Sequence, residues 1–256
     1  MGVDVMDNKE LVRLQRALYE SRNPTRRWLH CSRRDWIELA MRRFLSQGER
    51  ALEIGPGSGV YIPVLKDLCA QVCVSDCEHA YLEAIETLYC DDPAVRTVVD
   101  DITNSKLNDE SFDLVLCTEV VEHIADSSAA MRNIARVMKP SGILVLSTPQ
   151  RYSSLEVVAR VALSRELLWL TRLFYREPVL ELGHINLMTA RELQVQMSAA
   201  GLRIVEQYKG GLYLPLVAEL LGVTGQRIAA WLEQRIRGTP CDGILWTQYY
   251  VVRRTR

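Results

Sequence analysis

The chain has 256 residues, enough to bury a core as one domain or as one domain with a cap, and its hydrophobic fraction of 48% and charged fraction of 25% are ordinary for a globular protein. The net charge of −1 hides an acidic middle, since residues 51–130 hold 3 Lys/Arg against 16 Asp/Glu while both flanks are basic; this segregation argues against one broad nucleic-acid-binding face. Seven cysteines without a C-x-x-C pair indicate neither a disulfide framework nor a zinc site. We expect a cytoplasmic protein, because no apolar run reaches membrane-span length and the N-terminus is too charged for a secretory signal.

Two helices are predicted ahead of the main domain, over Lys9–Glu20 and Trp28–Phe44, with Asn23 and Pro24 between them. The second helix is rich in aromatic residues and in arginine. We favour helices that pack against a sheet and hold their arginines in water. A lid over a bound ligand, and a basic contact with anionic membrane lipid or a phosphate-bearing substrate, stay open as alternatives. The predicted division is an N-terminal helical lid, residues 1–48, and a main domain, residues 49–256.

A strand, a tight turn and a helix are predicted around three alternating glycines. The apolar run Ala51–Ile54 ends at Gly55, and Gly57 and Gly59 follow; residues 61–68 then have helical spacing of their apolar side chains. Glycine is required where a turn takes positive φ or where backbone approaches a ligand closely. A helix beginning there offers free N–H groups to an electron-rich ligand.

The spacing of these glycines excludes two common nucleotide motifs. A dinucleotide fingerprint needs G-x-G-x-x-G, and Val60 occupies the position of its last glycine. A P-loop needs a lysine after the glycines, and none is present.

Strands and helices then alternate, which predicts a parallel, doubly wound sheet with ligands at the carboxyl ends of its strands. Asp76 ends the second strand, where a nucleotide fold places the acid that binds ribose hydroxyls. The expected strands are 70–75, 95–99, 111–117 (continuing into 118–124) and 143–148, and the expected helices are 81–88 and 129–138, with a turn over 139–142.

The second half of the chain adds two apolar helical inserts, at about 150–185 and 210–240. The first contains a basic amphipathic stretch, Ser153–Arg176, expected as a cap over the active site, with peripheral membrane contact as the alternative. The second contains helical segments 213–221 and 226–236. Around them we expect a helix, Ala190–Ala200, with Thr189 as N-cap, a strand over 203–208 and an antiparallel last strand over 244–252. The inserts lie on the expected substrate side and favour a hydrophobic acceptor; packing on each other or a dimer surface explains them equally well.

The glycine loop, with Glu53 two residues ahead of it, resembles motif I of the class I S-adenosylmethionine (SAM)-dependent methyltransferases. The resemblance extends over residues 50–150 through three further motifs: Asp101-Ile102, Phe112–Val115 with Glu119–His123, and Lys139–Leu144, in which Ser141 replaces a usual glycine. The subgroup it suggests contains ubiquinone- and menaquinone-biosynthesis and natural-product methyltransferases. No N/D-P-P-Y-like motif follows the fourth strand, so a nucleic-acid substrate is not expected.

This resemblance implies an α/β, Rossmann-like, seven-stranded, mostly parallel sheet with an antiparallel last strand and helical cap inserts. It also implies SAM as cofactor. Glu53 and the three glycines are expected at the methionine end of the cofactor, Asp76 at the ribose, and Asp101 with Ile102 at the adenine. Cys77 and Thr118 complete the expected cofactor-binding set.

Four histidines are candidates for the base that a hydroxyl acceptor needs, since imidazole titrates near neutral pH. His79 is expected to be exposed, and His30 lies among the arginines of the second helix. His184 is the first candidate and His123 the second, because both are expected at the mouth of the cofactor site. No cluster with metal-ligand spacing is apparent in the sequence, so no metal is expected.

The predicted function is SAM-dependent methyl transfer to a hydroxyl, or to a carbon, of a hydrophobic small molecule such as a quinone precursor, polyketide or lipid. The alternatives are a non-catalytic SAM-binding subunit or scaffold, and a SAM-using enzyme with other chemistry, because a fold does not determine a function. The oligomeric state is not predicted.

Overall fold

The computed structural model describes residues 17–154 and 184–255. The predicted helices over 9–20 and 153–176 therefore lie largely outside the described residues. The described helices are α2 (Pro24–Phe44), α3 (Ile62–Leu68), α4 (His79–Leu88), α5 (Ser127–Val137), α8 (Ala190–Ala199) and α9 (Pro215–Ile236), with short 3-10 turns η1 (Ile102–Asn104), η2 (Val121–His123) and η3 (Asp242–Ile244). The strands are β1 (Gly48–Ile54), β2 (Cys69–Asp76), β3 (Val95–Val99), β4 (Phe112–Thr118), β5 (Met138–Pro149), β6 (Leu202–Gly210) and β7 (Thr247–Arg254).

These strands form one seven-stranded sheet in the order β3-β2-β1-β4-β5-β7-β6. Strands β1 to β5 pair in parallel, and β7 pairs antiparallel with β5 on one side and β6 on the other. The predicted fold class is confirmed. The order reverses between β1 and β4, which is the switch point where open α/β sheets bind ligands.

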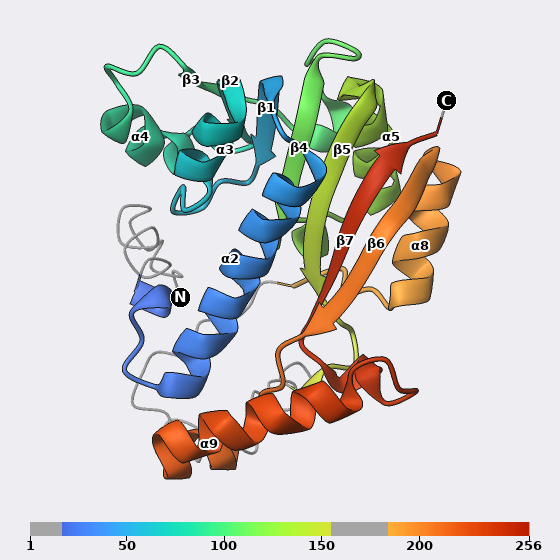
Figure 1. The fold of residues 1–256 in the computed structure, drawn as a ribbon. Coiled ribbons are helices and arrows are strands. Elements are labelled where there is room, and N and C mark those ends of the chain that lie inside the picture. Colours follow the sequence, from blue (N-terminus) through green and yellow to red (C-terminus); the bar gives the residue numbers. More distant parts are fainter. Residues whose placement is uncertain (1–16, 155–183, 256) are drawn as a thin grey trace, which may run out of the picture.

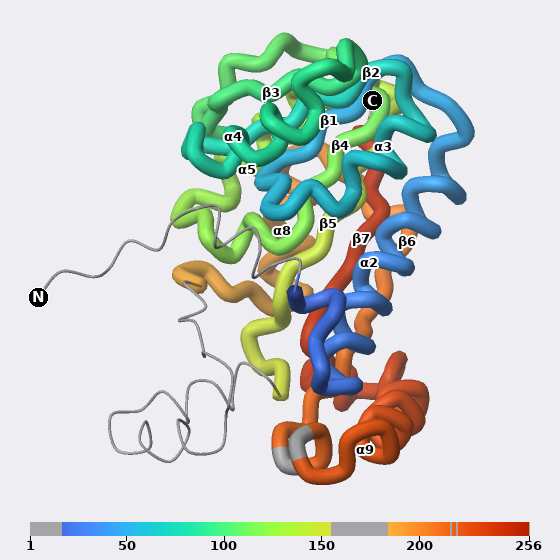
Figure 2. The backbone as a smooth tube through the Cα atoms, turned by 90° about the vertical axis from the view of Figure 1, so that its left-hand side faces the viewer, coloured from blue at the N-terminus to red at the C-terminus, as the bar shows by residue number. Residues whose placement is uncertain are grey.

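Helices cover both faces of the sheet, and the alternation of side chains along each strand sorts the core into two clusters. Leu52 and Ile54 of β1 pack with α5 and α8, whereas Ala51 packs with α2, α3 and α4. Figure 2 shows the same layers from the side. Glu53, next in the alternation, therefore points to the face that carries α2 and α3.

Helix α2 crosses the front of the sheet and packs on α9 at its lower end (Figure 1). Asn23 caps its start, where its side chain accepts the N–H groups of Thr25 and Arg26 at 2.9 and 3.2 Å. Trp36 stacks on Tyr208 and lies 4.8 Å, ring to ring, from Tyr249. The predicted packing of this helix on the sheet is what the structure has.

Two local expectations were wrong. The expected turn over 139–142 is a bulge within β5, because Phe112 pairs with Met138 while Leu114 pairs with Ile143. The expected continuation of strand 4 past Thr118 is broken at Glu119, whose φ is 55°, and the segment after it is the 3-10 turn η2. The two helical segments expected in the second insert are confirmed: they make up α9, and Gly222, whose φ of 49° and ψ of −123° are not helical, separates them at a kink.

The expected capping box of α8 is confirmed, since the Thr189 side chain accepts the Glu192 N–H and Glu192 accepts the Thr189 N–H. Cys69 and Cys73, within β2, are buried, whereas Cys77 is exposed because it follows the last residue of that strand. Among the described residues, no helix is both long enough and apolar enough to cross a membrane.

Substitutions of Gly59 and Gly222 test how much stability depends on the absence of a Cβ at each position. Both have positive φ, but a Cβ at Gly59 would lie 2.6 Å from Ile85 Cδ1, whereas a Cβ at Gly222 would meet nothing within 4 Å. We expect Gly59→Ala to lower the free energy of unfolding by about 2–4 kcal/mol, from strain plus overpacking, and Gly222→Ala by only about 1 kcal/mol. Denaturant unfolding of both variants measures this; equal losses would contradict the packing of the glycine loop.

Candidate functional site

Loops from neighbouring strands meet at the switch point between β1 and β4. The Gly55 N–H donates to the Ser75 carbonyl at 2.8 Å, which joins the end of β1 to the end of β2. A Cβ on Gly55 would lie 2.5 Å from Val120 Cγ2, so the loop after β1 lies directly against the loop after β4. The Asp100 N–H donates to the Asp76 carbonyl at 2.9 Å and adds the end of β3.

The glycine loop has the backbone that its sequence predicts. Gly55, Gly57 and Gly59 take φ values of 67°, 50° and 70°, a region that side chains disfavour. The Gly59 N–H closes the turn on the Pro56 carbonyl at 2.8 Å, and α3 begins at Ile62. The loop therefore presents backbone, without Cβ atoms at three positions, along the end of β1.

Glu53 is a buried carboxyl at the start of this loop. Its neighbours across the sheet are the apolar residues Val74 and Leu116, and only 1% of it is exposed. Its Oε2 atom has no hydrogen-bond partner. Burial raises the pKa of Glu53 to about 8, because the charged form loses its hydration. A cationic ligand at this point would compensate the charge.

Asp76 is the last residue of β2, and Cys77 follows it; their roles toward a cofactor stay predictions. Asp76 is half-buried, and its Oδ1 accepts the Glu78 N–H at 3.0 Å. Burial raises the pKa of the Asp76 carboxyl, while hydrogen bonds to the carboxylate oppose the shift. The Cys77 side chain is exposed beside it.

The end of β3 places two adjacent aspartates in different surroundings. Asp101 is exposed and caps η1, accepting both the N–H and the hydroxyl of Thr103 at 2.8 Å. Ile102 is only 5% exposed and packs in the core beside α5. Asp100, which sequence reasoning passed over, is buried; one of its oxygens accepts the Lys106 N–H, and the other has no partner. The adenine roles of Asp101 and Ile102 stay predictions.

After β4, Thr118 is half-buried and Glu119 turns the chain with a positive φ. The Glu119 carboxylate accepts a hydrogen bond from the Ser147 hydroxyl at 2.8 Å. Its other oxygen forms an ion pair with the Arg33 guanidinium, at an N–O distance of 2.6 Å. Arg33 reaches this point from α2, so the N-terminal helix is tied to the end of β4.

The burial of Arg33 corrects the expectation that the arginines of α2 stand in water. Its guanidinium lies 5.1 Å from the centroid of the Trp246 ring and 3.2 Å from His30 Nδ1. Burial acts to lower the pKa of Arg33, but the Glu119 carboxylate raises it above its ordinary value. Burial, together with Arg33 and Arg26, lowers the pKa of His30 to about 3, so His30 is neutral at physiological pH. Sequence reasoning missed Arg33 because it is one of six arginines in this region.

The two histidines expected as bases lie side by side. The ring centroids of His123 and His184 are 5.1 Å apart in an edge-to-face arrangement. The contact is held by backbone, since the N–H groups of Ile185 and Asn186 both donate to the Glu122 carbonyl, at 3.0 and 2.9 Å. The Asn186 side chain also donates to the Ile124 carbonyl at 2.8 Å. The loop containing His184 is thereby fastened to η2. The catalytic roles of both histidines stay predictions.

Glu122, beside these histidines, is the most buried acid of the site and was not singled out by the sequence. It has no exposed surface, and its Oε2 accepts the Thr148 hydroxyl at 2.9 Å while its Oε1 has no hydrogen-bond partner. Burial first, and the nearby Glu119 second, raise the pKa of Glu122 well above its ordinary value. The pattern Glu-x-x-Glu-His after a strand was the signal that could have identified it.

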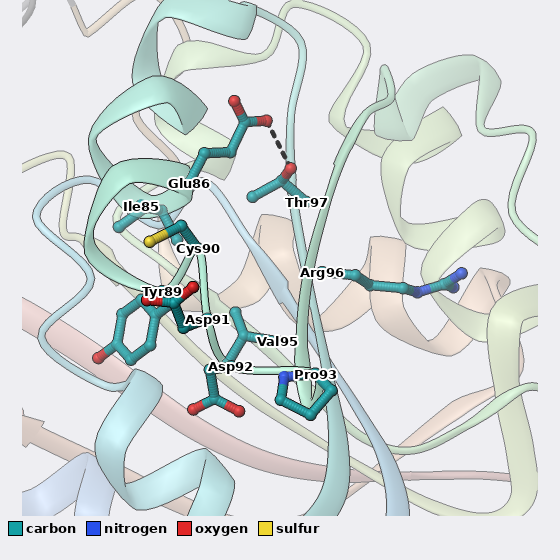
Figure 3. Close-up of a pocket in the computed structure, with 10 residues that line it drawn as sticks. All are labelled: Ile85, Glu86, Tyr89, Cys90, Asp91, Asp92, Pro93, Val95, Arg96 and Thr97. Carbon is teal, nitrogen blue, oxygen red and sulfur yellow. Dashed lines mark hydrogen bonds between the residues drawn. The ribbon is translucent and has the colours of Figure 1, made fainter.

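A separate cavity of about 680 Å³ contains none of these residues. Figure 3 shows that it lies between the end of α4 and the start of β3, where Glu86 accepts a hydrogen bond from Thr97 at 2.6 Å. Its lining residues are Ile85, Glu86, Tyr89–Pro93 and Val95–Thr97. This is the amino end of β3, opposite to the edge where the loops of the site meet.

Comparisons with known proteins agree with this geometry. A family model described as "Methyltransferase domain" matches residues 26–207. The chain is 31% identical, over 175 residues, to a ubiquinone biosynthesis O-methyltransferase of Azorhizobium caulinodans; the match covers 68% of this chain and 66% of that relative. A second relative of the same name, from Rhizobium leguminosarum, is 28% identical with 65% of its length covered. The matches thus span just under two thirds of the length of these relatives.

Solved structures of low sequence identity share the fold. The N-methyltransferase NodS of Bradyrhizobium japonicum, in complex with S-adenosyl-L-homocysteine (SAH), aligns with a TM-score of 0.59 at 16% identity, covering 97% of both chains. The [4+2]-cyclase SpnF aligns with a TM-score of 0.58 at 16% identity, covering 86% of this chain and 80% of the cyclase. The family model spans well over half of the chain, and the chain therefore belongs to the class I SAM-dependent methyltransferase family.

Proposed function

We propose that this protein binds SAM along the glycine loop and transfers its methyl group to a hydroxyl of a hydrophobic small molecule. The observation that carries the proposal is the arrangement at the switch point: a buried acid and three left-handed glycines on one side, and a paired His123 and His184 on the other. The relatives named ubiquinone biosynthesis O-methyltransferase support an acceptor of the quinol class.

The residues of the glycine loop fit the proposed cofactor. SAM supplies a methyl group on a sulfonium, and its methionine end carries a cationic amino group. Glu53 is a carboxyl with an unpartnered, buried oxygen, so an ammonium group placed against it would replace lost hydration by an ion pair. Asp76 is available at the end of β2 for ribose hydroxyls.

The acceptor hydroxyl has to lose its proton as its oxygen forms the new bond to carbon, while the electron pair of the broken C–S bond stays on sulfur. We assign the removal of this proton to the cluster of His123, His184 and Glu122, with His184 as the first candidate base. Apolar surface lies beside the cluster, since Ile185, next to His184, is 67% exposed. Such surface suits a hydrophobic acceptor.

Asp76→Ala tests the cofactor site. Losing charge-assisted hydrogen bonds to ribose costs roughly 1.5–3 kcal/mol, so the Kd for SAH is expected to rise about tenfold to a hundredfold. Calorimetric titration of the purified chain with SAM and with SAH measures this. Asp91→Ala is the matched control, because Asp91 is exposed at the opposite edge of the sheet. A folded wild-type protein that binds neither compound would overturn the proposal.

Glu53 makes cofactor binding depend on pH. With a pKa of about 8 in the free protein, Glu53 is mostly protonated at pH 7, and a bound ammonium group favours its carboxylate. Binding therefore releases a proton, and affinity for SAH is expected to rise from about pH 6 to about pH 7.5, by at most about tenfold per pH unit. Glu53→Gln should bind more weakly and without this pH dependence. An affinity that falls over this range in the wild type would show that Glu53 does not meet the cation.

His184→Ala and His123→Ala test the removal of the proton. We expect kcat for a hydroquinone or catechol acceptor to fall by about 10²–10⁴ while the Kd for SAH is unchanged. His79→Ala is the control, because His79 is exposed on α4 beside Glu83 and Glu86. Formation of SAH and of the methylated product is followed by mass spectrometry. SAM binding without any product from a broad panel of quinols would favour a non-catalytic role or another use of SAM.

A further inference from the structure

Aromatic rings gather around Arg33 on the side of the site that α2 and β7 form. The ring centroids of His30 and Trp246 lie 5.4 Å apart in an edge-to-face arrangement, and the Tyr19 ring lies 6.0 Å from that of His30. The Arg33 guanidinium contacts the first two rings, at 5.1 Å from the Trp246 centroid and with Nη2 at 3.2 Å from His30 Nδ1. Neither cofactor binding nor proton removal, as proposed above, uses these rings.

The rings lie at the edge of the sheet where the loops of the site meet. Trp246 directly precedes β7, and its carbonyl accepts the Gln150 N–H at 2.7 Å, just beyond the end of β5. Arg33 also forms its ion pair with Glu119, directly after β4. The rings therefore adjoin the loop after β4, which carries His123.

Arg33 determines which nitrogen of His30 carries the proton. A guanidinium N–H can only donate, so His30 Nδ1 is the acceptor in this contact. Burial first, and then the charges of Arg33 and Arg26, lower the pKa of His30 to about 3, so the ring is neutral at physiological pH. A neutral imidazole whose Nδ1 accepts a hydrogen bond holds its proton on Nε2. His30 is therefore a hydrogen-bond donor at Nε2 and not a base for the reaction.

Trp246 supplies a second N–H group. Only 7% of this residue is exposed, and within the described part of the chain its indole Nε1 has no hydrogen-bond partner. Leu29, Tyr213 and Ala218 pack with Trp246, so the indole has largely apolar surroundings. An indole nitrogen can only donate, and a buried donor without an acceptor costs free energy. Buried tryptophans usually find an acceptor, and a ligand atom would supply the one that is missing here.

The charges around these rings favour a neutral ligand. Arg33 is balanced by Glu119, so the pair offers no excess charge to a carboxylate or a phosphate. Two N–H donors on adjacent aromatic rings instead match an oxygen bound to an aromatic ring, because the oxygen accepts hydrogen bonds while its ring packs against theirs. Quinols and catechols carry such an oxygen in addition to the hydroxyl that would receive a methyl group.

We propose that His30 and Trp246 form a subsite that donates hydrogen bonds to a second oxygen of an aromatic acceptor, beside the hydroxyl that is methylated. The methylation of that hydroxyl rests on the proposed function, whereas binding of the second oxygen does not require it. Arg33 is a positioning residue, since it holds the His30 imidazole in the donating tautomer. A site built to donate to an oxygen rejects the analogue that lacks it, because the buried donors are then left without acceptors. The subsite therefore selects catechols and quinols over simple phenols.

Two ligands that differ by one oxygen test the subsite. The full chain, saturated with SAH, is titrated calorimetrically with 4-tert-butylcatechol and with 4-tert-butylphenol. We expect the wild type to bind the catechol about tenfold more tightly. His30→Phe and Trp246→Phe each keep an aromatic ring but lose the N–H donor, so each should weaken catechol binding about fivefold to tenfold and change phenol binding by less than about twofold. His79→Phe and Trp231→Phe are matched controls at exposed positions and should bind both ligands as the wild type does.

Nitrogen NMR gives a readout that a purely structural role would not move. The indole Nε1–H resonance of Trp246, assigned by its loss in Trp246→Phe, should shift when the catechol is added and stay in place when the phenol is added. The imidazole nitrogens of His30, assigned with His30→Phe, should show the proton on Nε2 from about pH 6 to about pH 8. A His30 ring protonated on Nδ1 would contradict the role of Arg33.

Equal affinity of the wild type for the two ligands, or a catechol preference that survives in both phenylalanine variants, would overturn the inference. The wild-type comparison needs no variant, so the inference can fail even where a substitution unfolds the chain; melting curves show which variants are folded. SAH binding separates this subsite from the proposed function. SAH binding without a catechol preference leaves methyl transfer without the subsite. A catechol preference that Trp246→Phe abolishes, in a chain that does not bind SAH, leaves the subsite without methyl transfer.

Discussion

At the switch point of this sheet, three glutamate side chains lie near one another, and an arginine forms an ion pair with one of them. Glu53, Glu119 and Glu122 are brought from β1 and the segment after β4 into the protein, and Arg33 supplies a guanidinium to only one of them. Removing a carboxylate from water costs free energy unless a positive charge is nearby, so burial favours the protonated form of Glu53 and of Glu122. These two carboxyls lie on different sides of the same loop junction. Glu53 lies at the start of the glycine loop and Glu122 beside the paired histidines, and a cationic cofactor at the glycine loop would compensate the first of these carboxylates.

The ion pair of Arg33 with Glu119 also attaches helix α2 to the loop after β4, which is part of the site. Trp36 of helix α2 contacts Tyr208 of β6 and Tyr249 of β7, and Arg33 of the same helix reaches Glu119, just after β4. Glu119 is itself fixed by Ser147 of β5 and by its left-handed backbone. A displacement of α2 would therefore leave a buried carboxylate without its partner, which is strongly unfavourable. The helix is better described as part of the wall of the site than as a separate unit.

Much of the fold could be predicted because the strands are short apolar runs separated by glycine, proline and acidic residues. Strand β3 was predicted at its observed bounds, and Thr189 was identified as a cap because capping is a local interaction. The site was only half predictable. The glycine loop has a local signature, but the inward turn of Arg33 depends on Glu119, 86 residues away, and the contact of His123 with His184 depends on backbone bonds from a distant loop. The expected continuation of β4 beyond Thr118 was wrong because Glu119 has a positive φ, which glutamate rarely adopts and which the sequence did not indicate.

The position of β7 has a consequence for how the chain folds as it is made. This strand lies between β5 and β6, yet it is the last of the described strands along the chain. Until it is synthesised, β5 has an open edge and β6 has no partner in the sheet. Exposed, unpaired edges favour association with other chains. A ribosome-bound intermediate would thus hold a complete five-stranded parallel unit, including the glycine loop, with one edge that needs protection until the final strand closes it.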